Sequence, residues 1–379
     1  MRVNQQHWSA SGAELASTGP RCEDARLVFA FGSARHIRDS GMWGELRARW
    51  PEARIVACST AGEIAQTHVH DDSLVATALS FERSGVQAAS VRILGIEHSA
   101  RAGRKLAEQL DPRGLRHVLV LSEGLHVNGS ALVQGLLESL PRGVAVTGGL
   151  AGDGSRFERT VVALDERPSG DGDSVVAVGL YGSALRVGFG SLGGWEPFGP
   201  ERRVTRARGS VLYELDGEPA LGLYKMYLGE HAAQLPSSGL LFPLSIREGE
   251  REAVVRTILA VDEREQSLTF AGEIPEGAPA RLMRANFDRL VDGASGAAQA
   301  CSSVLGGEAP DVGVLISCVG RKLLLQQRVE EEVEAVRHVL GPRPVLTGFY
   351  SYGEISPFTP SARCELHNQT MTITTLIED

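Results

Sequence analysis

A repeated unit is the feature of this 379-residue sequence that most limits its fold. Each of three segments runs from an apolar stretch ending in glycine, through a helix-like stretch, to a second apolar stretch that ends in a glycine and an acidic residue. The two glycines are 30, 28 and 33 residues apart, at Gly32 and Gly62, Gly124 and Gly152, and Gly320 and Gly353. The acidic residues that follow are Glu63, Asp153 and Glu354. Three matches in the same context indicate internal duplication.

Strands that alternate with helices predict an α/β fold made of these repeated strand–helix–strand units. Antiparallel hairpins expected at residues 74–94 and 254–270 would make the sheets mixed, with a single strand over 254–261. Asn128 is the expected N-cap of a helix in the second copy. In the third copy a helix is predicted on the spacing of Leu325, Val329, Val333, Val336 and Leu340. The chain length favours two lobes, with a boundary expected at the helix-like segment 219–229.

Composition and charge argue against several classes of protein. A net charge of −9 is unlike that of a nucleic-acid binder, which normally carries a basic surface. No window approaches the roughly twenty apolar residues of a membrane span. Residues 1–8 lack the apolar stretch of a secretory signal, so we expect a cytoplasmic protein. The five cysteines are far apart and odd in number, which favours free thiols over a disulfide framework or a zinc ribbon.

Sequence motifs give little support to an enzyme. Residues 188–193 match the dinucleotide fingerprint, but a turn-like segment follows where a helix should begin, so a strand and loop are expected there. Cys58 and Ser59 follow a strand, as nucleophiles often do, without a local base to activate them. His68 and His70 lie on one face of an extended segment, which fits either zinc ligands or a polar loop. We therefore expect a ligand-binding protein and not an enzyme.

Two groups of residues are candidates for the ligand site. The turns at Gly62 and Gly152 can present backbone amides to a ligand. The carboxylates of Glu63 and Asp153 can bind a cationic group or cap the next element. The second group is a mixture of aromatic and polar residues near the C-terminus, typical either of a small-molecule pocket or of an internally bonded core. It comprises Cys318, Arg321, Tyr350, Tyr352, Glu354, His367, Asn368 and Thr370.

The density of polar groups favours a pocket in the C-terminal lobe, because buried polar atoms without partners cost about 1–3 kcal/mol each. In such a pocket Arg321 is expected to pair with a ligand carboxylate or a haem propionate. The N-terminal turn at 58–63 would then be its structural counterpart.

The same segments resemble the F-box and intracellular signal transduction (FIST) family. Residues 56–64, together with 148–154, which include Gly149, Gly152 and Asp153, are similar to the FIST N-terminal domain. Residues 318–321, 349–354 and 366–370 are similar to the C-terminal domain, and 224–229 resemble the helix between the domains. The resemblance implies an N-terminal domain at 25–218 and a C-terminal domain at 219–379.

The resemblance also implies a sensory protein. FIST proteins are regarded as intracellular sensors of small ligands, with amino acids suggested as ligands, and one bacterial branch binds haem and senses nitric oxide. The sequence is similar to the stand-alone bacterial form, which implies signalling through a partner such as a histidine kinase or a cyclic-dinucleotide enzyme. For haem, His367 is the first candidate for the axial ligand, with Cys58 and Cys318 as alternatives. A purely structural hydrogen bond of His367 fits the sequence equally well.

Overall fold

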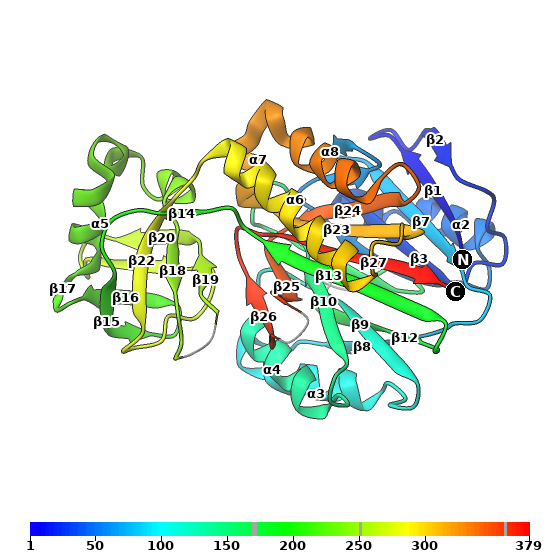
Figure 1. The fold of residues 1–379 in the computed structure, drawn as a ribbon, viewed down its shortest axis with the longest axis horizontal. Helices are drawn as coiled ribbons and strands as arrows, with labels where there is room; N and C mark the ends of the chain where they lie inside the picture. Colours follow the sequence, from blue (N-terminus) through cyan, green and yellow to red (C-terminus); the bar gives the residue numbers. More distant parts are fainter. Residues whose placement is uncertain (169–172, 250–251, 360–361) are drawn as a thin grey trace.

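The chain forms two lobes, a large one that contains most of the strands and a smaller one at residues 196–284 (Figure 1). This computed structural model describes residues 1–168, 173–249, 252–359 and 362–379. The large lobe holds three six-stranded sheets that contain both parallel and antiparallel pairs. The predicted mixed α/β class is therefore confirmed.

Each six-stranded sheet contains one copy of the repeated unit. A parallel pair of strands lies beside an antiparallel third strand, which pairs in turn with the strand that begins the copy. Sheet 1 consists of β1 (Arg2–Trp8), β2 (Glu14–Thr18), β3 (Leu27–Gly32), β4 (Arg54–Ser59), β7 (Leu74–Ser80) and β11 (Val162–Leu164). Sheet 2 consists of β8 (Gly85–Arg92), β9 (Leu115–Ser122), β10 (Ala145–Leu150), β12 (Ser174–Tyr181), β25 (Gly353–Pro357) and β26 (Cys364–His367). Sheet 3 consists of β5 (Glu63–Ala65), β6 (His68–His70), β13 (Leu185–Leu192), β23 (Val312–Cys318), β24 (Val345–Ser351) and β27 (Met371–Glu378).

The three copies are interlocked because each one contributes a strand to the sheet of another. Strand β5 of the first copy pairs with β24 of the third, and β25 of the third pairs with β10 of the second. Strand β11 of the second copy pairs with β4 of the first, which closes the exchange into a ring. The predicted duplication is confirmed, and no sheet is complete without a strand from another copy.

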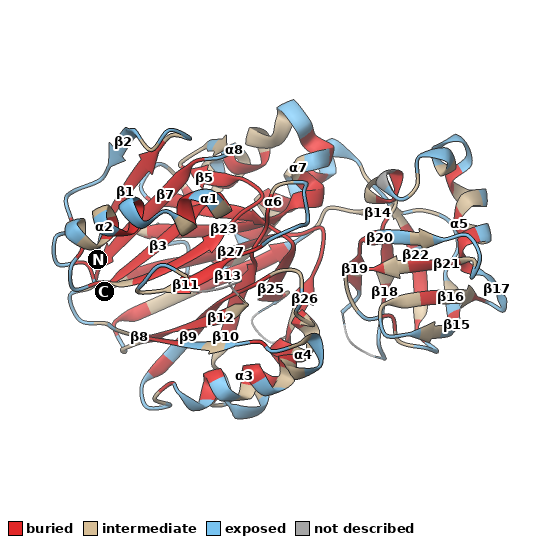
Figure 2. Cartoon of the chain, turned by 180° about the vertical axis from the view of Figure 1, so that it is seen from behind, coloured by how far each residue is buried: buried red, intermediate tan, exposed pale blue. Residues whose placement is uncertain are grey.

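The apolar core lies both between the sheets and between the sheets and the helices outside them (Figure 2). Phe31, Leu121 and Ile316 occupy similar places near the ends of β3, β9 and β23 and share one buried cluster. The Phe31 and Phe349 rings are 4.9 Å apart within it. The helices of the large lobe are α1 (Ala34–Arg38), α2 (Ser40–Arg49), α3 (Ser99–Glu108), α4 (Gly129–Ser139), α6 (Phe287–Val304), α7 (Val319–Leu325) and α8 (Val329–Leu340), with a 3₁₀ turn η1 (Ile96–His98) before α3 and another, η4 (Gln326–Arg328), before α8.

The smaller lobe is inserted between β13 and α6 and has its own apolar core. Its elements are β14 (Glu196–Pro197), β15 (Arg202–Arg208), β16 (Val211–Leu215), β17 (Glu218–Pro219), α5 (Ala220–Leu228), η2 (Gly229–Gln234), η3 (Ser237–Leu241), β18 (Leu244–Ile246), β19 (Val254–Arg256), β20 (Ile258–Asp262), β21 (Ser267–Phe270) and β22 (Pro279–Arg284). The expected boundary between residues 218 and 219 falls in β17, inside this lobe. Sequence domains and spatial lobes therefore divide the chain differently.

Several local predictions need correction. Residues 74–94 do not form a hairpin: β7 pairs with β1 and β3, whereas β8 begins the second copy and pairs with β12. Of the helix predicted over 325–340, residues 329–340 form α8, whereas Leu325 ends α7 and Gln326, with a left-handed φ of 50°, begins the 3₁₀ turn η4 between the two helices. The strand predicted over 254–261 is divided between β19 and β20, and only β20 forms the hairpin with β21. Residues 188–192 lie in strand β13 and Gly193 begins the segment that follows it, as expected for a strand and loop.

Candidate functional site

The glycine turns of the three copies meet at one place, which we call the hub (residues 59–63, 150–154 and 350–354). The Gly152 amide donates to the Ser59 carbonyl at 2.9 Å, and the Ala61 amide donates to the Tyr350 carbonyl at 2.8 Å. The Tyr352 amide donates to the Leu150 carbonyl at 3.1 Å and completes the cycle. The structure therefore brings together the predicted residues of all three turns, together with Gly149, which pairs with Glu354. These turn residues are Ser59, Gly62, Glu63, Gly152, Asp153, Tyr350, Tyr352 and Glu354.

Two buried carboxyls of the hub have the same hydrogen-bond pattern. Glu63 accepts from the Thr60 hydroxyl on one oxygen and from the Ser73 amide and hydroxyl, at 3.1 and 2.8 Å, on the other. Glu354 accepts from the Ser351 hydroxyl at 2.5 Å and from the Thr370 amide and hydroxyl at 3.2 and 3.1 Å. Burial raises the pKa of Glu63 to about 7 and that of Glu354 to about 8. Both carboxyls thus cap turns within the chain.

Asp153 differs from the other two acids because it makes an ion pair. Its Oδ1 atom lies 2.5 Å from Nη2 of Arg156, and its Oδ2 accepts from the Arg159 amide at 3.2 Å. The hydroxyl of Tyr352 donates to the Gly154 carbonyl at 3.2 Å, and burial raises the pKa of Tyr352 to about 12. All three acidic side chains of the hub therefore have partners inside the protein.

The predicted thiols and histidines lie in different surroundings. Cys58 and Cys318 are buried, as are the other cysteines, and burial raises the pKa of both thiols, which is the opposite of activation. The amide of Val161 donates to the Ser59 hydroxyl at 2.8 Å. His68 lies on β6 with Nδ1 3.3 Å from Oε1 of Glu330. Within the described part of the chain, no three His, Cys, Asp or Glu side chains are grouped to hold a metal ion.

Arg321 has a different role from the ligand contact predicted for it. Its side chain is fully buried, with Nε and Nη2 donating to Oε2 of Glu332 at 3.0 and 2.7 Å. Nη1 donates to the Gly193 carbonyl at 2.6 Å, and Nη2 also donates to the Leu290 carbonyl at 2.7 Å. Arg321 therefore joins α8, α6 and the segment that follows β13. A ligand carboxylate would have to replace these internal acceptors.

His367 faces Glu354 across the paired strands β25 and β26, and both side chains are fully buried. Its Nε2 donates to the Ser356 carbonyl at 2.7 Å, the Phe358 ring lies 4.1 Å away, and burial lowers its pKa to about 4. Nδ1 has no hydrogen-bond partner among the described residues, but the ring is fully buried and Phe358 lies edge-on against it, so neither nitrogen is open to a haem iron in this arrangement. Asn368 is buried beside His367, and its Oδ1 has no hydrogen-bond partner among the described residues.

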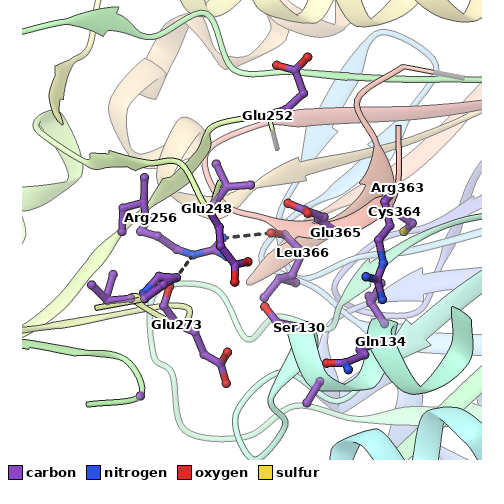
Figure 3. A pocket seen from close by; sticks show the side chains of 17 residues that line it. Ser130, Gln134, Glu248, Glu252, Arg256, Glu273, Arg363, Cys364, Glu365 and Leu366 are labelled. Carbon is purple, nitrogen blue, oxygen red and sulfur yellow. Dashed lines mark hydrogen bonds between the residues drawn. The ribbon is translucent and has the colours of Figure 1, made fainter. Parts of the chain in front are cut away.

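A cavity of about 620 Å³ lies between the two lobes, away from most of the predicted residues (Figure 3). Helix α4 and strand β26 form its wall on the large lobe, and β19 with the loops around it forms the opposite wall. The described lining contains four glutamates and two arginines, so it has a surplus of negative charge. The lining residues with polar side chains are Ser130, Gln134, Glu248, Glu252, Arg256, Glu273, Arg363, Cys364 and Glu365.

Arg256 is the most unusual residue of this cavity. It is only 5% exposed, and burial lowers its pKa to about 10, against the opposing effect of Glu365 and Glu273. Nη1 donates to the Leu366 carbonyl of the large lobe at 3.0 Å, and Nε makes a long 3.4 Å contact with the Glu273 carbonyl (Figure 3). Among the described residues, Nη2 has no acceptor and no carboxylate makes an ion pair with Arg256.

Sequence reasoning missed Arg256 and the cavity. The one local signal is an arginine in the apolar run Val254-Val255-Arg256-Thr257-Ile258. The other lining residues come from segments far apart in the sequence.

Comparison with known proteins supports the resemblance. The FIST N domain matches residues 26–218, and the FIST C domain matches residues 220–357. An uncharacterized protein of Mycobacterium tuberculosis, from strains CDC 1551 and H37Rv, is 27% identical over 251 residues, which are 63% of this chain and 63% of the relative. An uncharacterized protein of Methanocaldococcus jannaschii is 27% identical over 163 residues, 39% of this chain and 31% of the relative. The chain thus spans under two thirds of the length of these curated relatives.

A solved structure of a cyanuric acid hydrolase from A. caulinodans aligns over 100% of this chain and 99% of that chain, at a TM-score of 0.37 and 9% identity. That similarity is too low to support an argument about activity. No described helix is both long enough and apolar enough to cross a membrane. The two domain matches together cover most of the chain and agree with the motifs of the hub. The chain belongs to the FIST family, whose N and C domains are sensory domains of signal transduction.

Proposed function

We propose that this FIST protein senses a small ligand that binds in the cavity between the lobes. Arg256 is the observation that supports this proposal most directly. A buried cation whose hydrogen bonds go only to backbone carbonyls is costly, because the nearby charges of Glu365 and Glu273 offset its removal from water only in part. An anionic group of a ligand would supply an opposite charge through charge-assisted hydrogen bonds. The cavity volume of about 620 Å³ also falls in the range of roughly 300–1,000 Å³ usual for small-molecule sites.

An amino-acid-like ligand fits the charges of the cavity best. Its carboxylate would bind Arg256. Its ammonium group would lie near Glu365 and Glu273, the two acids whose charges raise the pKa of Arg256. The surplus of glutamates in the lining opposes a ligand with several negative charges. A zwitterion avoids that repulsion and uses both kinds of side chain.

Binding without catalysis is the role proposed for this cavity. Its thiol, Cys364, donates to the Val146 carbonyl at 3.1 Å, and burial raises its pKa. No histidine stands among the described residues of the lining. We propose that occupancy is passed in the cytoplasm to a partner protein, and the FIST resemblance supports a histidine kinase or a cyclic-dinucleotide enzyme as that partner.

Titration with each common L-amino acid tests the proposed site, read by isothermal calorimetry and by thermal denaturation. At least one is expected to bind the wild-type chain and to raise its Tm. Arg256→Gln should weaken that binding by about 10- to 100-fold, the loss expected when charged hydrogen bonds of about 1.5–3 kcal/mol are removed. Arg203→Gln, the same change at an exposed position of the smaller lobe, is the matched control. Equal affinity in both variants would place the ligand elsewhere.

Haem sensing, with nitric oxide as the signal, is the weaker alternative because the surroundings of His367 do not suit iron. An absorption spectrum after haem titration is expected to show no Soret band from a specific complex. A stoichiometric Soret band that shifts with nitric oxide and is lost in His367→Ala would establish haem sensing instead.

A further inference from the structure

The lobes are connected in two different ways. The chain crosses between the lobes twice, after β13 and before α6 (Figure 1). Near these crossings the lobes share an apolar cluster that includes Leu240 and Leu241 of the smaller lobe and Leu290 and Leu324 of the large one. At the cavity, the contacts are polar. Arg256 of β19 donates to the Leu366 carbonyl of β26 at 3.0 Å, and Nδ2 of Asn128 donates to Oε1 of Glu273 at 2.9 Å. The apolar cluster can therefore act as a pivot, with two polar bridges holding the lobes together across the cavity.

Each bridge joins one charged side chain to one neutral partner. Arg256 is bound to a neutral carbonyl and Glu273 to a neutral amide, and both charged residues line the cavity. Hydrogen bonds with one charged partner are already about twice as strong as neutral ones, and a bond between two opposite charges adds their Coulomb attraction. A ligand carboxylate that binds Arg256 through both Nη1 and Nη2 would therefore compete with the Leu366 carbonyl, which accepts from Nη1. A ligand ammonium would likewise compete with Asn128 for Glu273.

We infer that a zwitterionic ligand opens the lobes by taking Arg256 and Glu273 from these two bridges. The inference rests on the proposed function, since it needs the ligand to bind in the cavity. Asn128 extends the effect into the large lobe, because its Oδ1 accepts from the Ala131 amide at 3.0 Å and caps α4. When Glu273 is released, the Asn128 side chain that caps α4 loses its hydrogen bond to the smaller lobe. The resulting movement of the smaller lobe is the signal that a partner protein would recognise.

Distance measurements between two spin labels test the bridges in the full-length chain without any ligand. Arg101→Cys on α3 and Glu218→Cys on β17 place labels at exposed positions of the two lobes, and the native cysteines are all buried. Asn128→Asp keeps an oxygen to cap α4 but sets like charges against Glu273, and Arg256→Ala removes the other bridge. The double variant is expected to shift the label distance by more than about 2 Å or to broaden it clearly. Arg203→Ala should leave it unchanged.

The ligand arm uses the labelled wild-type chain with any L-amino acid that binds by calorimetry. Binding is expected to move the label distance in the same direction as the double variant. A ligand that binds without moving the labels overturns the inference and leaves the proposed function standing. An unchanged distance in the double variant, folded by circular dichroism, also overturns it. If no amino acid binds, the proposed function fails and the ligand trigger fails with it, even when the variants separate the lobes.

Discussion

Replacement of Arg321 by methionine is expected to destabilise the large lobe severely. The side chains of Arg321 and Glu332 are both fully buried, and two guanidinium nitrogens donate to one carboxylate oxygen. The other oxygen of Glu332 accepts from the Ser317 hydroxyl at 2.9 Å and the Tyr350 hydroxyl at 2.6 Å. Arg321→Met would leave this carboxylate buried without its cation. It would also remove the donors to the Gly193 and Leu290 carbonyls.

The expected loss of stability in Arg321→Met comes mainly from the Glu332 carboxylate, which stays buried without its cation. Removal of one partner of a buried ion pair typically costs about 3–5 kcal/mol. The two hydroxyl donors to Glu332 persist and moderate the loss, while the two orphaned carbonyls add to it, so we expect about 4 kcal/mol. Arg321→Met combined with Glu332→Leu removes both charges. The double variant should therefore be more stable than Arg321→Met alone, although Glu332→Leu removes further hydrogen bonds.

Urea denaturation followed by circular dichroism measures these differences in the free energy of unfolding. Arg328→Met is the matched control, because Arg328 pairs with Glu331 at the surface, where both side chains are 42% exposed. Exposed pairs contribute about 0–1 kcal/mol. A loss below about 1 kcal/mol for Arg321→Met, or equal losses for the single and double variants, would refute the structural role. Loss of ligand binding at unchanged stability would restore the predicted ligand contact.

Three further changes test the fold. Val333→Asp places a charge at a fully buried position of α8 and should cost more than about 3 kcal/mol, seen as a large fall in Tm. In the folded chain the pKa values of Glu63 and Glu354 are raised from 4.5 to about 7 and about 8, so both carboxyls hold their protons more tightly than in the unfolded chain. The stability that they contribute is therefore present at low pH and is lost as the pH rises through these values. Between about pH 6.5 and 8, the free energy of unfolding measured with urea should fall by about 2 kcal/mol, and Glu354→Gln should remove most of this fall. Buried histidines have the opposite effect on stability, but only at lower pH. Gly135→Ala would place Cβ 2.0 Å from a backbone carbonyl of α3 and should cost about 1–3 kcal/mol of stability. The control is Gly44→Ala, which has open space around it and should stabilise α2 slightly. Equal Tm values for the two variants would contradict the close packing of α3 and α4.

The repeat could be recognised in the sequence because its signals are local. A strand followed by Gly62 and Glu63 has the same residue pattern as one followed by Gly353 and Glu354, whatever lies around them. The exchange of strands is not local, because nothing in residues 63–65 specifies that they pair with β24 and not with β4. The break at Gln326 was missed for a related reason, since the apolar spacing continues across it.

The site was harder to predict than the fold. The polar density near Arg321 and Glu354 is real, but these groups bond one another within the large lobe. The residues around Arg256 come from both lobes and are brought together only by the insertion of one lobe into the other. Charge, polarity and spacing along the sequence do not distinguish a buried arginine that faces a cavity from one that faces glutamate.

The ring of exchanged strands has a consequence for how this protein can be divided. A fragment ending at residue 218 would lack β24 and β25, so β5 and β10 would each lose a hydrogen-bonded neighbour. The complementary fragment would present β24 without β5. Unpaired edges of buried strands are templates for aggregation. The FIST N and FIST C matches thus describe stretches of one cooperative unit, in which all three sheets gain their last strand only when the entire large lobe has assembled.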